Sequence, residues 1–169
     1  VELEVSDLLV DMAREGIDIA IRTGTALPDT MIARQIGTLG RGLYASTDYA
    51  QRAGLPAHPD ELAQHRLIAN SAATRLNHWP FVINGERAVI VADGRWRSND
   101  TNVVAGMVLQ GLGIGRLSTI AAEPLRQQQR LLPVLTEFVD PQPIPIYAVT
   151  ASARHRLPIH GRNPPPDRR

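Results

Sequence analysis

Apolar and polar side chains alternate along the first residues of the chain. In residues 1–5 an apolar side chain occurs at every second position, which is the period of a half-buried strand. Residues 6–15 change to a helical period, with Ser6 suited to cap the helix and Gly16 suited to end it. Residues 17–21 alternate again. A strand, a helix and a strand in this order form a βαβ unit with parallel strands, so the pattern predicts an α/β fold.

The remainder of the chain carries the same mixture of strand and helix signals. A β-rich stretch covers residues 31–45, and its three glycines are expected to interrupt it. Thr47 begins a short helix that Gly54 ends, and another helix begins at His58. Further strands are predicted at residues 67–70, 81–83, 88–91, 114–117, 131–135 and 144–149.

Turn and cap residues mark element boundaries in the second half of the chain. The dipeptide Asn84-Gly85 between two apolar runs is typical of a hairpin turn. Asn99 or Asp100 caps the next helix, since both side chains accept hydrogen bonds from helical N–H groups. Ser118 opens a further helix, which Pro124 is expected to break.

Both ends of the chain differ from those of a complete domain. The chain opens in mid-pattern with Val1 rather than with an initiator methionine, which indicates a piece cut from a longer protein. Residues 156–169 hold four prolines, four arginines and two large apolar residues, a composition that cannot form a packed core. We therefore expect residues 159–169 to form a disordered tail.

Composition and charge restrict the class of partner. The 18 Lys+Arg and 17 Asp+Glu leave a formal net charge of +1, whereas a domain that grips DNA by itself usually carries a clear basic excess. The chain has no cysteine, which excludes disulfides and thiolate metal sites and is compatible with the cytoplasm. No apolar run approaches the roughly 20 residues that span a bilayer. We expect a small-molecule or protein partner and no membrane association.

Several short motifs follow one another in an order typical of a single family. They are Asp18-Ile-Ala-Ile-Arg-Thr-Gly24, Ile32-Ala-Arg-Gln-Ile-Gly37, Leu43-Tyr-Ala-Ser46 with Tyr49, Pro59-Asp-Glu-Leu62 with His65, Trp79-x-Phe81, Asn99-Asp100, Gly111-Leu-Gly-Ile-Gly115, Leu132-Pro-Val-Leu135 and Pro145-Ile-Tyr-Ala-Val149. Over roughly residues 1–158 the chain resembles the effector-binding domain of LysR-type transcriptional regulators.

The resemblance implies a two-lobed α/β fold of the periplasmic-binding-protein type 2 class, with a ligand cleft between the lobes. The first lobe would comprise residues 1–43 and 144–158, and the second lobe residues 44–143. Closure of such a cleft on a ligand is a hinge motion, which can be transmitted to an attached DNA-binding part.

The chain departs from the family pattern at both ends. The winged helix-turn-helix, the linker helix and the first strand and helix of the effector domain are absent, and the C-terminal amphipathic helix is replaced by the Pro/Arg tail. The first lobe is therefore expected to be incomplete. We expect it to be poorly stable alone, because the strands at 1–5 and 17–21 would lack a central neighbour.

Eight residues are candidates for the walls of the effector cleft. They are Thr23, Gly24, Asn70, Ser71, Ser98, Asn99, Asp100 and Thr101. Thr23 and Gly24 follow a strand at the end where open α/β sheets bind ligands, although a plain flexible turn would need the same glycine. Asn70 and Ser71 end the first strand of the second lobe, where ordinary loop polarity is the alternative.

The segment from Ser98 to Thr101 precedes a helix. A helix N-terminus offers free N–H groups and a partial positive charge, which suit an effector carboxylate. Asp100 opposes this use, because as the helix cap it already occupies that position. The alternative interpretation of the whole segment is helix capping alone.

The remaining conspicuous residues have structural interpretations. Arg34 and Arg41 are expected to be solvated strand residues, although either has the charge to pair with an anionic effector. Trp79 and Phe81 are expected in the core. Trp96 is equally suited to the core and to an interface.

Sequence motifs give no argument for catalysis or for a cofactor. The glycines at 111–115 follow a helix and precede a strand, the reverse of a dinucleotide loop. The five histidines lack metal-site spacing, and no G-x-S-x-G nucleophile turn occurs. We predict no catalytic residue, no metal and no cofactor.

The favoured interpretation is an allosteric sensor domain. A small metabolite would bind between the lobes of a homo-dimer or tetramer, and DNA would be contacted only through the missing N-terminal domain. One alternative is a solute-binding protein of a transporter, which shares the lobe architecture. A second alternative is a remnant that serves only for dimerisation.

Overall fold

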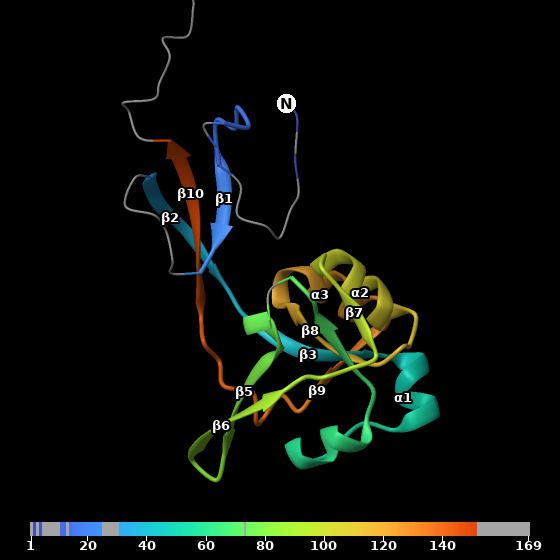
Figure 1. Cartoon of the computed structure of the whole chain (residues 1–169). Coiled ribbons are helices and arrows are strands. Elements are labelled where there is room, and N and C mark those ends of the chain that lie inside the picture. Colours follow the sequence, from blue (N-terminus) through green and yellow to red (C-terminus); the bar gives the residue numbers. More distant parts are fainter. Residues whose placement is uncertain are drawn as a thin grey trace, which may run out of the picture. The chain divides into compact units, whose positions relative to one another are not determined.

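The computed structural model describes residues 2, 4, 11–12, 14–24, 31–72 and 74–151 (Figure 1). The chain divides into two compact units. The larger unit contains Thr38–Ile144. The smaller unit takes its described residues from both sides of that segment, so the chain passes between the units after residues 37 and 144.

The larger unit is built on a mixed sheet of five strands in the order β7-β4-β8-β3-β9. These strands are β3 (Arg41–Ser46), β4 (Leu67–Asn70), β7 (Trp96–Ser98), β8 (Ile114–Ser118) and β9 (Leu131–Val134). β4 is parallel to β7 and to β8, whereas β3 is antiparallel to β8 and β9. The carboxyl ends of β4, β7 and β8 therefore meet at one edge of the sheet, the edge at which open α/β sheets bind ligands.

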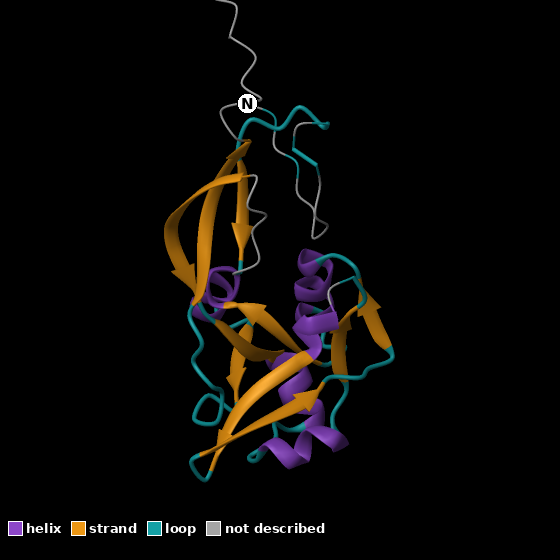
Figure 2. Cartoon of the chain, turned by 60° about the vertical axis from the view of Figure 1, so that its left-hand side comes forward, coloured by secondary structure: helices purple, strands orange, loops and turns teal. Residues whose placement is uncertain are grey.

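Helices connect these strands (Figure 2). The α-helices are α1 (Thr47–Ala53), α2 (Thr101–Leu109) and α3 (Thr119–Gln127), and Pro59–Gln64 and Thr74–Asn77 form 3-10 helices. The hydroxyls of Ser46 and Ser118 cap α1 and α3, and the Asp100 carboxylate caps α2. The predicted starts of these helices are confirmed, and the helix predicted from His58 is a 3-10 helix.

A two-stranded hairpin, β5 (His78–Ile83) and β6 (Glu86–Val91), forms a second sheet in this unit. Asn84 and Gly85 connect its strands with φ values of 51° and 83°. Two consecutive positive φ values are what a type I′ turn requires. The predicted hairpin is therefore confirmed.

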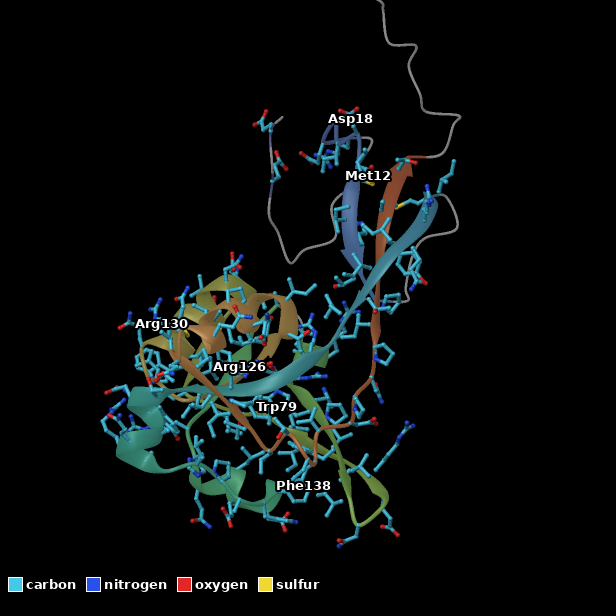
Figure 3. The ribbon with its side chains drawn as sticks, turned by 180° about the vertical axis from the view of Figure 1, so that it is seen from behind. Met12, Asp18, Trp79, Arg126, Arg130 and Phe138 are labelled. Atoms are coloured by element: carbon cyan, nitrogen blue, oxygen red, sulfur yellow. The ribbon has the colours of Figure 1, made fainter. Side chains whose placement is uncertain are left out.

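The core of the larger unit has two clusters, which lie on opposite faces of the five-stranded sheet. Successive residues of a strand point to opposite faces, and Leu43 and Tyr44 of β3 accordingly belong to different clusters. Trp79 and Phe81, each 1% exposed, pack with Leu43, and Phe138 covers the same cluster (Figure 3). The prediction that both aromatic residues lie in the core is confirmed.

The smaller unit contains a three-stranded sheet in the order β1-β10-β2. Its strands are β1 (Ala20–Thr23), β2 (Met31–Leu39) and β10 (Ile144–Ala151). β1 is antiparallel to β10, with Ala20 opposite Val149 and Thr23 opposite Ile146. Among the described residues of this unit, the buried apolar side chains are those of Met12 and Val149.

The strand predicted at residues 17–21 is displaced toward the C-terminus. β1 starts only at Ala20, and Ile19 and Ile21, which the alternation assigned to a buried face, are 62% and 61% exposed. Its predicted parallel partner, residues 1–5, lies mostly outside the described residues, as does the tail at 159–169. The helix predicted at residues 6–15 lies mostly outside the described residues, and residues 14–16 form a turn in which Gly16 has a positive φ of 70°.

Two local predictions are wrong. α3 continues through Pro124 instead of breaking there. Pro124 removes the N–H that would bond to the carbonyl of Ile120, and Ile120 is 61% exposed, so water can hydrate that carbonyl. The glycines of residues 31–45 interrupt the β structure only at Gly40.

Candidate functional site

Six of the eight predicted site residues meet at the carboxyl edge of the five-stranded sheet. They are Asn70, Ser71, Ser98, Asn99, Asp100 and Thr101. The parallel register of β4 and β7 places Asn70 opposite Ser98, and the Ser71 N–H donates to the Ser98 carbonyl at 2.8 Å. α2 begins directly after β7, which adds its N-terminus to the same edge.

The polar groups at the start of α2 already make local hydrogen bonds. The Asp100 carboxylate accepts from the N–H groups of Asn102 at 2.7 Å and Val103 at 3.3 Å, and the Ser98 hydroxyl accepts from the Asp100 N–H at 3.1 Å. Asp100 is therefore the N-cap, and Asn99 is exposed. A ligand anion cannot take the position of the Asp100 carboxylate, so the helix end alone does not form an anion site.

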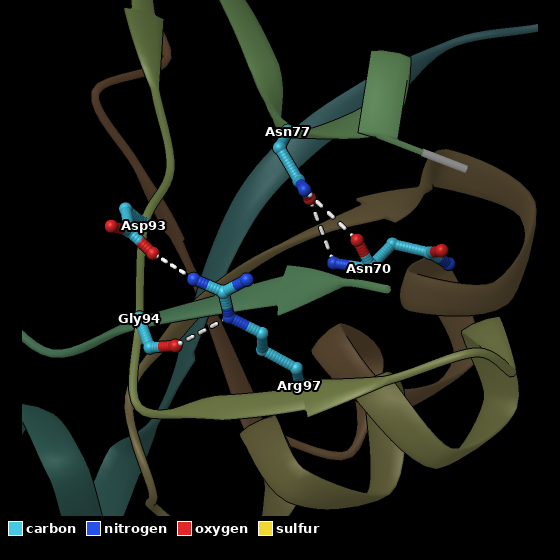
Figure 4. Close-up of polar contacts among 5 residues, drawn as sticks. All are labelled: Asn70, Asn77, Asp93, Gly94 and Arg97. Carbon is cyan, nitrogen blue, oxygen red and sulfur yellow. Dashed lines mark hydrogen bonds and ion pairs between the residues drawn. The ribbon is translucent and has the colours of Figure 1, made fainter. Parts of the chain in front are cut away.

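Asn70 is held by a side chain from the next connection. The Asn70 N–H donates to Asn77 Oδ1 at 2.7 Å, and Asn77 Nδ2 donates to the Asn70 carbonyl at 2.9 Å (Figure 4). The Ala72 N–H donates to Asn70 Oδ1 at 2.9 Å. Asn70 is only 6% exposed, so these bonds fix the end of β4 in a rigid position.

The other end of β7 is braced by an exposed ion pair. Arg97 pairs with Asp93 and its Nε donates to the Gly94 carbonyl at 3.1 Å (Figure 4). Gly94 lies so close to β4 that a Cβ there would meet the Leu67 carbonyl oxygen at 1.7 Å. These contacts hold β7 against β4 and so place Ser98 beside Asn70.

A narrow crevice opens at this edge and brings in a residue that the sequence did not single out. Its lining residues are Ile68, Asn70, Leu76, Asn77, Trp79, Thr101, Val104 and Arg116. Arg116 lies on β8, and its Nη1 donates to the His78 carbonyl at 3.3 Å. Burial, and next the nearby charge of Arg41, lower the pKa of Arg116 to about 10. The available signal was a cation in an otherwise apolar strand, Ile114-Gly-Arg-Leu117.

A larger cavity of about 500 Å³ adjoins the start of β3. Its lining residues are Thr38, Leu39, Gly40, Arg41, Gly42, Leu43, Tyr44, Thr119, Pro133, Val134, Thr136, Val139, Pro141, Gln142 and Pro143. Most of these side chains are apolar, and the volume falls within the range of small-molecule sites, about 300–1,000 Å³. Both segments at which the chain enters and leaves the larger unit contribute to it.

Thr23 and Gly24 lie in the smaller unit, at the end of β1. Gly24 has a φ of 108°, and its N–H donates to the Pro145 carbonyl at 3.0 Å. The turn therefore needs glycine for its backbone conformation. Thr23 is exposed, and its part in ligand binding stays a prediction.

No group of three or more His, Asp or Glu residues that could hold a metal ion occurs in the described part of the chain. None of the described helices is both long and apolar enough to cross a membrane.

The family model of the LysR substrate binding domain matches residues 1–160. The chain belongs to this family. A protein of Haemophilus influenzae described as an uncharacterized HTH-type transcriptional regulator is 29% identical over 160 residues, which are 94% of this chain and 54% of that protein. The HTH-type transcriptional activator TtdR of Escherichia coli is 28% identical, over 92% of this chain and 50% of that protein. The chain thus spans about half the length of these relatives.

Solved structures of LysR-type regulators have the same fold. The full-length Vibrio cholerae virulence activator AphB is 26% identical with a TM-score of 0.72, over 89% of this chain and 50% of AphB. The regulatory domain of CrgA from Neisseria meningitidis has a TM-score of 0.78 at 22% identity, over 86% of this chain and 71% of that domain. The predicted periplasmic-binding-protein-like α/β fold is confirmed.

Proposed function

We propose that this LysR substrate binding domain is the effector-sensing part of a transcriptional regulator, and that a small metabolite binds at the carboxyl edge of β4 and β7. The observation that carries the proposal is the convergence of Asn70, Ser98, Thr101 and the start of α2 at that edge in a member of this family. Open α/β sheets bind ligands at this edge, and a few fixed polar groups in a largely apolar site give orientation and specificity.

In the proposed mechanism, Thr23 and Gly24 at the end of β1 also take part in effector binding. A ligand that binds one arrangement of the two units more tightly than another shifts the population toward it. The two chain crossings after residues 37 and 144 would serve as the hinge. The shift would reach DNA through a helix-turn-helix part outside this chain, within a dimer or tetramer in the cytoplasm.

Two alternatives are less well supported. The relatives named above are transcriptional regulators, which does not favour a solute-binding protein of a transporter. They are also not enzymes, and the proposed role needs ligand binding without catalysis. A remnant that only dimerises would self-associate without responding to any ligand.

The test is a thermal-shift screen of the full chain against chemically diverse neutral, cationic and anionic metabolites, followed by isothermal titration of each hit. Ser98→Ala and Thr101→Val should each weaken a hit by roughly fivefold or more, because each removes a hydroxyl from the site. Asn102→Ala, an exposed change on the same helix, should leave the Kd unchanged. A screen without any hit would argue against sensing. If a hit binds both site variants with unchanged affinity, the effector site lies elsewhere in the chain.

A further inference from the structure

Arg116 occupies an unusual place for a cation. It lies on β8 between Gly115 and Leu117, in a strand whose neighbouring residues are buried. Its register partner on β3 is Leu43, a member of the core cluster that contains Trp79. Desolvation of a guanidinium costs free energy, and such residues are normally paired with a carboxylate. In the described part of the chain, no ion pair joins Arg116 to a carboxylate.

A second arginine faces the same region. Arg41 lies opposite Ser118 on the β3–β8 ladder, two positions from the Leu43–Arg116 pair, so Arg41 and Arg116 are diagonal neighbours on one face of the sheet. The two charges repel each other, and this repulsion adds to burial in lowering the pKa of Arg116. An anion bound between the two guanidinium groups would be attracted by both charges.

Each of the two arginines lines a different hollow of the larger unit. Arg116 lines the crevice at the carboxyl edge, and Arg41 lines the cavity of about 500 Å³. Leu39, Leu43 and Val139 give that cavity an apolar surface. A ligand that contacts both the arginines and the apolar surface of the cavity therefore needs a charged group and an apolar body.

We propose that the effector is an organic anion, with its carboxylate between Arg41 and Arg116 and its apolar body in the cavity beside β3. This inference rests on the proposed function and assigns the ligand class for it. Guanidinium groups present several N–H donors in a fixed plane that matches a carboxylate, and such charge-assisted bonds are stronger than neutral ones. Arg116 then serves as the residue that selects anions over neutral analogues of the same shape.

The experiment compares matched probes on the full chain by isothermal titration and by NMR shifts of the Trp79 indole N–H. Hexanoate and octanoate carry both features, hexanol and octanol lack the charge, and acetate lacks the body. We expect the two long carboxylates to bind more tightly than their alcohols and than acetate. Arg116→Gln and Arg41→Gln should each weaken octanoate binding by about tenfold or more, whereas Arg130→Gln, an exposed change, should leave it unchanged.

A structural role for Arg116 gives a different pattern. Without ligand, Arg116→Gln should keep or raise the melting temperature, because it removes a partly buried, repelled charge. A fall in the melting temperature of Arg116→Gln would show that the side chain contributes to folding. Arg116→Lys keeps the charge and then decides the question: retained octanoate binding supports the inference, and lost binding contradicts it.

Equal binding of acids and alcohols, failure of the carboxylates to bind, or unchanged affinity in both glutamine variants would overturn the inference. Neutral hits in the metabolite screen, with no carboxylate binding, would overturn it and leave the proposed sensing function intact.

Discussion

At the residue scale, Gly94 shows how close backbone contact fixes the site. A Cβ at this position would meet the carbonyl oxygen of Leu67 at 1.7 Å and its carbonyl carbon at 2.7 Å. Backbone atoms cannot turn aside as a flexible side chain does, so β4 and β7 would have to separate. The position therefore accepts only glycine.

We expect Gly94→Ala to lower the free energy of unfolding by about 3 kcal/mol, as overpacking against backbone does. Gly106→Ala is the matched control, because the residue is inside α2 and a Cβ there would meet no atom within 4 Å other than its own helix backbone. Alanine at 106 should raise the free energy of unfolding by about 0.5–1 kcal/mol. Urea unfolding followed by circular dichroism measures both, and equal effects of the two changes would contradict the assigned contact.

A second residue-scale prediction concerns the cap of α2. Asp100→Ala removes two hydrogen bonds to the helix N-terminus and should lower the free energy of unfolding by about 1 kcal/mol. Asn99→Ala should change it by less than about 0.5 kcal/mol, since Asn99 is exposed and does not cap the helix. The same urea titration measures both changes. A larger loss of unfolding free energy in Asn99→Ala than in Asp100→Ala would show that Asn99 is the cap.

At the element scale, the end of β4 is held by the Asn77 side chain, which makes the two backbone hydrogen bonds that a neighbouring strand would otherwise make. Asn77 binds both the N–H and the carbonyl of Asn70, a residue that is 6% exposed. Asn77→Ala should therefore cost about 1–3 kcal/mol, because two buried backbone groups lose their partners. We also expect a large shift of the Asn70 amide resonance in a two-dimensional NMR spectrum.

Asn102→Ala provides the control for this change, since Asn102 is exposed on α2. It should leave both the unfolding free energy and the Asn70 resonance nearly unchanged. A stable Asn77→Ala variant with an unmoved Asn70 amide would show that β4 is held by its strand neighbours alone.

Elements whose signals are local were predicted well. Asn84 and Gly85 form the hairpin turn, Gly54 ends α1 with a φ of 71°, and Ser118 caps α3. Each of these features depends on interactions within a few residues along the chain, which the sequence displays directly. Pro124 was misjudged because its effect depends on whether the carbonyl of Ile120 is solvated, and that is decided by the position of the helix on the molecule.

At the scale of the whole molecule, the two units differ in their cores. The larger unit has two buried clusters, whereas the buried apolar side chains among the described residues of the smaller unit are Met12 and Val149. Ile19 and Ile21 of the smaller unit remain 62% and 61% exposed. Apolar burial is the main stabilising contribution to folding, so the smaller unit should open more readily.

Hydrogen exchange measures this difference. The amides that pair β1 with β10 should exchange at least roughly thirtyfold faster than those that pair β3 with β8, which corresponds to about 2 kcal/mol of local stability. Uniform protection across both sheets, with a single cooperative melt, would contradict a weak smaller unit.

The sequence by itself determined the alternation of strands and helices, the family and the segments that supply Asn70, Ser98 and Thr101 to one edge of a sheet. These follow from local periodicity, capping and the order of short motifs. The tertiary structure decided which strands pair, as with β1 against β10, and that Arg41 and Arg116 lie together. Unlike the hairpin, the pairs β1 with β10 and β3 with β8 join residues distant along the chain, and no local pattern specifies these partners. The charge environment of Arg116 therefore arises only when the sheet forms.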